Sequence, residues 1–214
     1  MRWIRPFYLY PQQVTDDLLD LYAGEEKITK YIDMPLQHIN DRMLKRMHRL
    51  GDRAAIDALV NRIRTRVPGV AFRTAFIVGF PGETEAEFEE LLAFLDAAQL
   101  DRVGCFAYSA VDGAVANALP NPVPEPVKQE RLARFMAVQA EISAARLVRK
   151  VGRSLDVLVD AVTGEVASAR SAADAPEIDG VVTIDGGGKL AAGDFARVTI
   201  TSAGEHDLRG RVAA

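Results

Sequence analysis

The feature that most constrains the fold is an alternation of apolar, strand-like runs with amphipathic helical segments over residues 1–150. The strand-like runs lie at residues 3–10, 31–36, 72–78 and 103–108. Helical segments with one apolar face lie between these runs. This order predicts parallel strands joined by right-handed crossovers, as in a TIM-like barrel or an open α/β sheet. Four strands are fewer than a closed barrel usually takes.

Capping residues predict where the helices begin. Thr15 precedes a helix that ends at Gly24, and Asn40 precedes a helix whose apolar face extends to Leu50. Thr84 and Glu87 have the spacing of a capping box, in which each side chain bonds the other residue's backbone N–H. A long amphipathic helix is expected at about residues 125–150.

The pattern changes near residue 150, where helical periods stop and short strands with Gly and Asp turns follow. Five strands are expected, at residues 154–161, 165–171, 179–184, 194–202 and 207–212. Their number and size predict a small antiparallel barrel of the OB-like kind. The charge also changes there, because residues 151–214 hold 10 acids and 6 bases, which accounts for the whole net charge of −4.

The composition excludes several classes of protein. The chain is 49% hydrophobic, which argues against disorder, and no apolar run reaches the roughly 20 residues that cross a bilayer. The first residues lack the pattern of a signal peptide, and the single cysteine fits a reducing compartment, so we expect a cytoplasmic protein. One cysteine is also too few for a thiolate-bound zinc ion or iron–sulfur cluster.

Two strand ends are candidate ligand sites, because α/β folds place ligands at the carboxyl ends of strands. The turn Gly79-Phe80-Pro81-Gly82-Glu83 joins a strand to a helix, and its glycines permit a close approach of a ligand to the backbone. The alternative is a tight structural turn. At the matching end of the preceding strand, Gln37 is the better candidate, since an amide both donates and accepts hydrogen bonds. His38 could also contact a ligand; on the alternative interpretation it caps the next helix or donates to a buried carbonyl.

Other polar residues are less informative. The five glutamates of residues 83–90 are interpreted as an acidic first turn and a solvated helix face. Cys105 is interpreted as a small hydrophobic residue inside a strand. In the tail, Asp174, Glu177 and Asp179 surround a proline and form an acidic loop. This acidity argues against a nucleic-acid partner and favours a basic protein partner, although a solvated loop without a partner remains an alternative.

Five segments taken together are informative about the family. They are WIRPFYLYP, YIDMPLQH, RTAFIVGFPGETE, LDRVGCFAYS, and GRSLDVLVD followed by RSAADAPEIDG. In this order they resemble the RimO-type methylthiotransferase family over almost the whole chain. Members are radical SAM enzymes that attach a methylthio group to an aspartate side chain of small-subunit ribosomal protein S-twelve. The resemblance implies the second half of a radical SAM barrel at residues 1–148 and a TRAM domain at residues 149–214.

The resemblance also implies roles for individual residues. The segment around Ile77 and Gly79 matches the strand that lies against the adenine of S-adenosylmethionine (SAM). Gln37 matches the polar position near the ribose or methionine end, and Phe106 lies on the next strand, whose backbone commonly faces the adenine. The TRAM domain, with the acidic loop at Asp174, Glu177 and Asp179, is expected to dock the basic substrate protein.

The cysteines of the family are absent from the sequence. Members bind two [4Fe-4S] clusters through an N-terminal domain and a C-x-x-x-C-x-x-C motif, and neither segment is present here. We therefore expect no catalytic residue, no metal ligand and no activity in this chain alone, and a separate upstream chain is one way to complete it. Two alternatives remain open, namely a portion of a tRNA methylthiotransferase and a non-catalytic binding module from a truncated gene.

Overall fold

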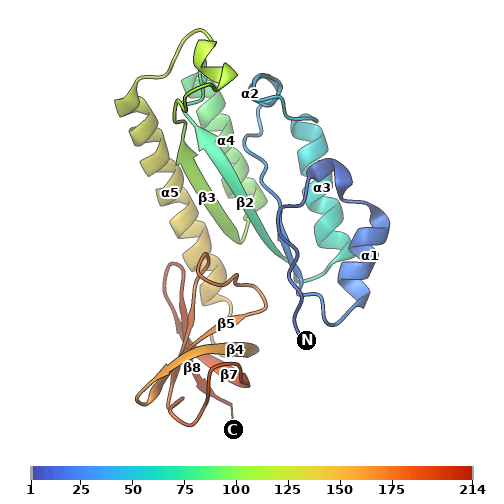
Figure 1. The fold of residues 1–214 in the computed structure, drawn as a ribbon, viewed down its shortest axis with the longest axis vertical. Coiled ribbons are helices and arrows are strands. Elements are labelled where there is room, and N and C mark those ends of the chain that lie inside the picture. The colour runs from blue at the N-terminus through green and yellow to red at the C-terminus, as the bar shows by residue number, and fades with distance from the viewer. Residues whose placement is uncertain (1, 214) are drawn as a thin grey trace. The chain divides into compact units, whose positions relative to one another are not determined.

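The computed structural model describes residues 2–213, which divide into two compact units (Figure 1). One unit comprises residues 6–26 and 32–139. The other comprises residues 2–5, 27–31 and 140–213. The second unit thus includes two short segments from the beginning of the chain as well as the strand-rich tail.

The first unit is built on a three-stranded sheet in the order β1-β2-β3. The strands are β1 (Tyr31–Asp33), β2 (Ala71–Val78) and β3 (Arg102–Ala107). Strands β2 and β3 are parallel and pair in register from Arg73 opposite Arg102 to Val78 opposite Ala107. The predicted α/β class with parallel strands is confirmed, with three strands in the described part of this sheet where the sequence predicts four.

The helices begin where the capping residues indicate. They are α1 (Asp16–Gly24), α2 (Asp41–Arg46), α3 (Arg53–Arg66), α4 (Glu85–Ala98) and α5 (Glu125–Val148), with short 3-10 helices η1 (Pro11–Gln13) and η2 (Val115–Ala118). Thr15 and Asn40 accept hydrogen bonds from the first-turn N–H groups of α1 and α2. Thr84 and Glu87 form both bonds of the capping box of α4.

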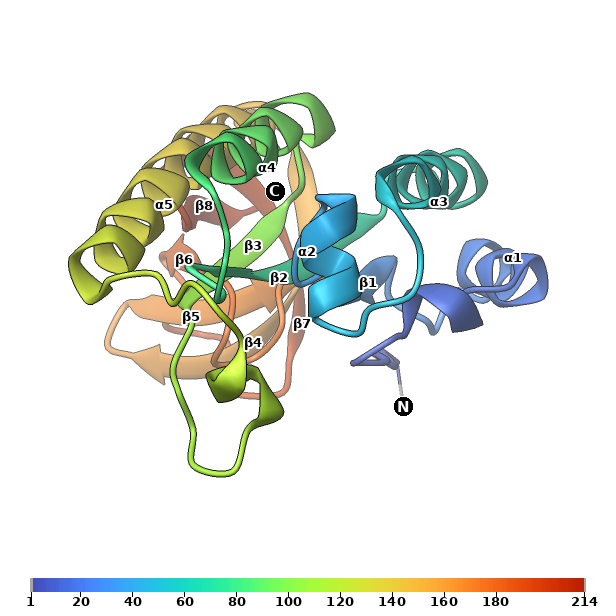
Figure 2. The same ribbon diagram turned by 90° about the horizontal axis from the view of Figure 1, so that it is seen from above.

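Helices cover only one face of the sheet. On that face Phe76 of β2 packs against Phe94 of α4 and Phe135 of α5, at ring-centre distances of 6.1 and 5.6 Å. Figure 2 shows α4 and α5 running along the same side of β2 and β3. On the other face Ile77 is half-buried and Phe106 is 62% exposed. The uncovered face is the one that would line the interior of a barrel.

The strand predicted at residues 3–10 is wrong, and the strand predicted at residues 31–36 is too long. Residues 3–10 form no strand, and only Ile4 makes an isolated bridge, to Ile28. Pro6 has no N–H to donate and Tyr8 has a left-handed backbone with φ 59°, so this run cannot continue a regular ladder. The strand predicted at residues 31–36 ends at Asp33, just before Pro35.

The helix predicted from Asn40 to Leu50 is also shorter than expected. It ends at Arg46, and His48 then takes a left-handed conformation with φ 53°. Leu50, expected on the apolar face, is 74% exposed. Periodicity alone missed this helix end, because the apolar spacing continues past it.

The tail of the second unit forms a closed barrel in the order β4-β5-β6-β8-β7. Its strands are β4 (Ser154–Thr163), β5 (Val166–Ser171), β6 (Val182–Asp185), β7 (Phe195–Ala203) and β8 (Leu208–Val212). All pairs are antiparallel except β6 with β8, which is parallel. Alternate strand residues fill the interior, among them Val157, Val159, Val182, Ile184 and Val198. The predicted five-stranded barrel is confirmed.

No helix within residues 2–213 is long and apolar enough to cross a membrane.

Candidate functional site

Three of the predicted SAM-contacting residues lie next to one another across the open edge of the sheet. The N–H of Gln37 donates to the carbonyl of Ala75, and the N–H of Ile77 donates to the carbonyl of Gln37, both at 2.9 Å. Ile77 in turn pairs with Phe106 of β3. The segment after β1 thus joins β2 by backbone bonds. Gln37 is the bridge partner of Phe76, whereas Ile77 pairs with Phe106, so Gln37, Ile77 and Phe106 form a staggered row at the carboxyl ends of the strands.

A hollow of about 210 Å³ lies beside Gln37. Its lining residues are Tyr8, Leu9, Tyr10, Pro35, Gln37 and Arg49. Arg49 is the only charged residue in this lining, so the hollow favours an anionic group. Tyr8 and Gln37 both have left-handed backbones, with φ 59° and 70°. Such strained positions are concentrated at ligand sites and require support from the surrounding structure.

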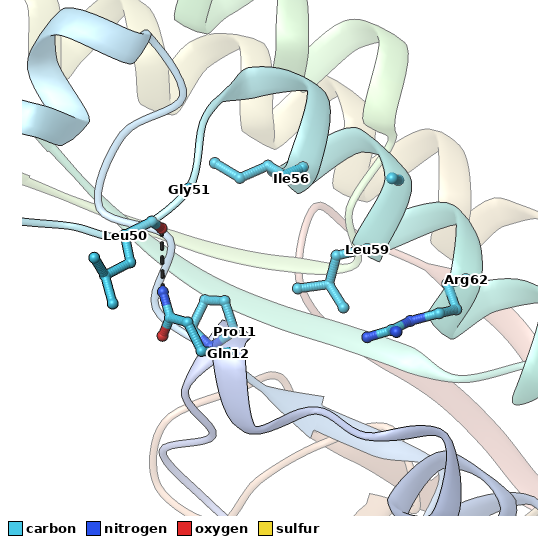
Figure 3. Close-up of a pocket in the computed structure, with 9 residues that line it drawn as sticks. Pro11, Gln12, Leu50, Gly51, Ile56, Leu59 and Arg62 are labelled. Carbon is cyan, nitrogen blue, oxygen red and sulfur yellow. Dashed lines mark hydrogen bonds between the residues drawn. The ribbon is translucent and has the colours of Figure 1, made fainter.

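The same unit has two further hollows, of which the smaller adjoins the hollow beside Gln37 and the larger adjoins the smaller. The smaller, of about 170 Å³, shares Tyr10, Pro35 and Arg49 with the hollow beside Gln37. A larger apolar pocket of about 380 Å³ lies between η1 and α3 (Figure 3). At its edge the side-chain amide of Gln12 donates a 3.1 Å hydrogen bond to the carbonyl of Leu50.

Gly79 is the fourth predicted SAM contact, and its N–H is already bonded within the turn. Its φ is +71°, and its N–H donates to Oε2 of Glu83 at 2.7 Å. A side chain there would place Cβ 2.4 Å from Cγ of Lys128. The glycine is therefore required for the turn and for packing against Lys128. Its role toward SAM stays a prediction.

A buried ionic network fastens this turn to the preceding strand end. Glu83 Oε1 lies 3.1 Å from His38 Nε2, and Glu83 Oε2 accepts a 2.7 Å hydrogen bond from Arg131 of α5. The side chains of His38 and Glu83 are completely buried. The N–H of Asn40 donates to Nδ1 of His38, so the neutral ring carries its proton on Nε2 and donates it to Glu83.

The interpretation of the glutamates at residues 83–90 as a solvated face is wrong for two of them. Glu83 is buried in the network above, and Glu87 is buried against Arg42 and the cap of α4. Burial alone would raise the pKa of Glu87, but hydrogen bonds from Arg42 and Thr84 outweigh it and lower the pKa to about 2. The carboxylates escaped notice because their partners come from distant elements.

The acidic loop after β5 is held mainly by its own carboxylates. Asp174 is buried and accepts a 2.5 Å hydrogen bond from the hydroxyl of Ser171. Asp179 accepts hydrogen bonds from the hydroxyl of Tyr31 at 2.6 Å and from the N–H of Ala175 at 2.8 Å. Of the three predicted docking residues, Glu177 is the exposed one.

Arg5 completes the support of this loop. Its guanidinium donates to the carbonyl of Ala172 at 3.0 Å and lies 4.2 Å from the ring centre of Tyr31. Burial lowers the pKa of Arg5. The docking role of Asp174, Glu177 and Asp179 stays a prediction, and the internal bonds of Asp174 and Asp179 leave Glu177 as the carboxylate best placed to meet a partner.

The donor groups of the chain do not fit an iron–sulfur cluster. Within residues 2–213, no group of three or more His, Cys, Asp or Glu side chains is arranged to hold a metal ion. Burial raises the pKa of the Cys105 thiol to about 12, and this one thiol would supply a single ligand where an iron–sulfur cluster takes several.

Two features of this region were not predicted from the sequence, namely Arg49 in the lining of the hollow and the contact between His38 and Glu83. Arg49 stands in no recognisable motif, and only the fold brings it to Gln37. The contact between His38 and Glu83 has a usable signal, because both residues follow strands of one parallel sheet and therefore lie at the same edge.

The fold, together with the row of Gln37, Ile77 and Phe106, agrees with one class of protein. A family model described as the radical SAM superfamily matches residues 4–95, and a TRAM domain model matches residues 151–213. The solved structure of coproporphyrinogen III oxidase (HemN) from Escherichia coli, a radical SAM enzyme, has a TM-score of 0.54 and 21% sequence identity. The match covers 66% of this chain and 32% of the HemN chain, and at this identity it supports the fold alone. The chain therefore combines a radical SAM segment with a TRAM domain.

Curated relatives narrow the class further. Ribosomal protein uS12 methylthiotransferase RimO from Xanthomonas oryzae pv. oryzae (strain PXO99A) is 57% identical over 210 residues, covering 97% of this chain and 45% of that protein. The protein of the same name from Alkalilimnicola ehrlichii is 51% identical over 210 residues, covering 98% and 47%. The chain is thus a homologue of the RimO-type methylthiotransferases over nearly its whole length. It spans about half the length of the curated relatives that it matches.

Proposed function

We propose that this chain supplies one side of the SAM cleft and the substrate-docking domain of a RimO-type enzyme. The enzyme as a whole would methylthiolate an aspartate side chain of ribosomal protein uS12 in the cytoplasm. The observation that carries this proposal is the staggered row of Gln37, Ile77 and Phe106 at the carboxyl ends of the strands, with Ile77 and Phe106 on the uncovered face of the sheet. A ligand site at this edge is what a parallel α/β sheet favours.

The residues of the row suit the parts of SAM. Phe106 offers an exposed ring and Ile77 an apolar surface for the adenine. Gln37 offers an amide for the ribose hydroxyls, and Arg49 offers a guanidinium for the carboxylate of the methionine moiety. When bound beside a reduced cluster, SAM supplies the radical that activates an unreactive C–H bond. The residues of this chain bind and orient SAM and carry no step of that chemistry.

The iron–sulfur clusters must be held by other residues, because the donors of this chain do not fit them. We propose two [4Fe-4S] clusters in the intact enzyme, carried by a polypeptide segment outside these 214 residues. The chain alone is then inactive.

The charge of the tail supports a basic protein partner. Residues 151–214 have 10 acids against 6 bases, and the exposed Glu177 adds to the acidic surface of the loop. A nucleic-acid partner would be repelled by this balance of charge. A tRNA methylthiotransferase is the competing function, and it requires the same barrel to bind RNA.

The SAM site is tested by calorimetry on the purified chain. We expect SAM to bind, and Arg49→Ala to weaken its affinity about tenfold through loss of one charge-assisted contact. Arg211→Ala, an exposed arginine of β8, is the matched control and should leave the affinity unchanged. Equal SAM affinities in the unaltered chain and the two variants would show that Arg49 does not contact SAM. Absence of SAM binding by the unaltered chain would argue against the proposed cleft.

The cluster and partner assignments have separate tests. Anaerobic reconstitution should load no [4Fe-4S] cluster, and a brown product that cleaves SAM would contradict the proposal. Titration of the chain with uS12 and with tRNA, each over a range of salt, should show binding to the protein only. Binding to tRNA that weakens steeply with salt would favour the tRNA enzyme.

A further inference from the structure

The segment Tyr8-Leu9-Tyr10 forms one wall of the hollow beside Gln37. Tyr8 is 75% exposed and Tyr10 is 55% exposed, although both are large aromatic residues. The expectation of a buried strand placed these rings in a core. Their exposure therefore needs another explanation.

The backbone of Tyr8 is held in an unfavourable conformation. Its φ of 59° lies in the left-handed region, which a residue with a bulky side chain adopts at a cost of about 1–2 kcal/mol. The exposed ring contributes little packing energy that would offset this cost. Strained backbone positions are concentrated at active sites and ligand-binding sites.

A buried carboxylate imposes the conformation. Asp33, at the end of β1, accepts a hydrogen bond from the N–H of Tyr8 at 3.2 Å through Oδ2. Its Oδ1 accepts a 2.7 Å hydrogen bond from Arg73 of β2, and its backbone carbonyl accepts one from Leu9 at 2.9 Å. The Asp33 side chain is only 1% exposed. The wall of the hollow is thus fixed to the sheet by two bonds to one buried residue.

The two sides of the hollow differ in exposure. Pro35, Gln37 and Arg49 are half-buried, whereas Tyr8 extends into solvent at the rim. Tyr8 therefore lies between solvent and the half-buried part of the hollow. In a hydrogen-atom transfer the second substrate must come into contact with the cofactor, so it has to pass this rim.

We propose that Tyr8 is a substrate-contacting, specificity-determining residue, and that its ring contacts the polypeptide segment carrying the side chain to be modified. This inference rests on the proposed function. A rigid tyrosine suits such a contact, because its ring covers apolar surface, its hydroxyl bonds a peptide group, and little side-chain entropy is lost. Asp33 is a positioning residue, since it acts only through the backbone of Tyr8.

The test separates recognition from stability. Tyr8→Gly removes the ring and also relieves the backbone, since glycine adopts a positive φ without strain. We expect its affinity for uS12 to fall about tenfold, its affinity for SAM to stay within twofold, and its melting temperature to stay equal or rise. Tyr8→Phe, which loses only the hydroxyl, should fall between the two proteins in affinity for uS12.

Gln99→Gly is the matched control, because Gln99 has a φ of 48° at the end of α4 and lies outside the hollow. It should leave binding of uS12 unchanged. Unchanged uS12 binding in Tyr8→Gly would overturn the inference, as would a parallel loss of SAM affinity or a lowered melting temperature. If the unaltered chain binds SAM but not uS12, the inference and the docking part of the proposed function both fail. If Tyr8→Gly alone binds uS12 normally, only the inference fails.

Discussion

At the scale of single residues, Glu83 connects three distant parts of the first unit. One carboxylate contacts the imidazole of His38, the guanidinium of Arg131 and the N–H of Gly79. All of these contacts are buried, so removal of the charge would weaken three interactions that water cannot replace. The network therefore holds the strand ends that carry Gln37 and Ile77.

We expect Glu83→Gln to lower the free energy of unfolding by up to about 3–5 kcal/mol, because it removes the buried counter-charge of Arg131 and leaves only the half-exposed Glu85 to pair with it. Urea unfolding followed by circular dichroism measures this. Glu85→Gln is the control, since the Glu85 side chain is half-exposed and its pairs with Arg131 and Arg134 should contribute at most about 1 kcal/mol. Equal losses in the two variants would contradict a structural role for the buried charge.

At the scale of elements, the turn between β2 and α4 requires glycine at position 79 for two reasons. Gly79 needs a left-handed backbone, and it also faces Lys128 of α5. Gly69, between α3 and β2, has a similar φ of 77° but no atom within 4 Å of an added Cβ. Comparison of the two glycines separates the cost of the conformation from the cost of the clash.

Gly69→Ala should cost about 1 kcal/mol through the backbone alone. Gly79→Ala should cost about 1–3 kcal/mol more, because Cβ would lie 2.4 Å from Cγ of Lys128. Addition of Lys128→Ala should recover most of the difference. Thermal unfolding of the three variants gives the values, and an unchanged cost in the double variant would show that Lys128 is not the obstacle.

At the scale of the whole molecule, the first unit has an open sheet face. Helices α4 and α5 cover one side of β2 and β3, whereas Phe106, Tyr8 and Tyr10 are exposed. An uncovered face with exposed aromatic rings promotes association between molecules.

Light scattering over a range of concentration should show self-association of the isolated chain. Phe106→Ser should reduce it, because it removes a large apolar side chain from the open face. Val115→Ser, at a still more exposed position in η2, should leave it unchanged. A monodisperse monomer at high concentration would contradict this expectation.

The sequence by itself determined the class of fold and most of its elements. Local signals were sufficient for these, since the caps at Thr15, Asn40 and Thr84 act within one turn of helix. The five tail strands were also predictable, because alternation is a property of the chain.

Only the tertiary structure decided what happens where distant segments meet. It placed Arg49 beside Gln37, buried Glu83 between His38 and Arg131, and held Tyr8 in a left-handed conformation through Asp33. The physical reason is that burial and charge pairing depend on neighbours brought together by folding. A glutamate in an acidic run has the same local pattern whether it faces solvent or a buried arginine.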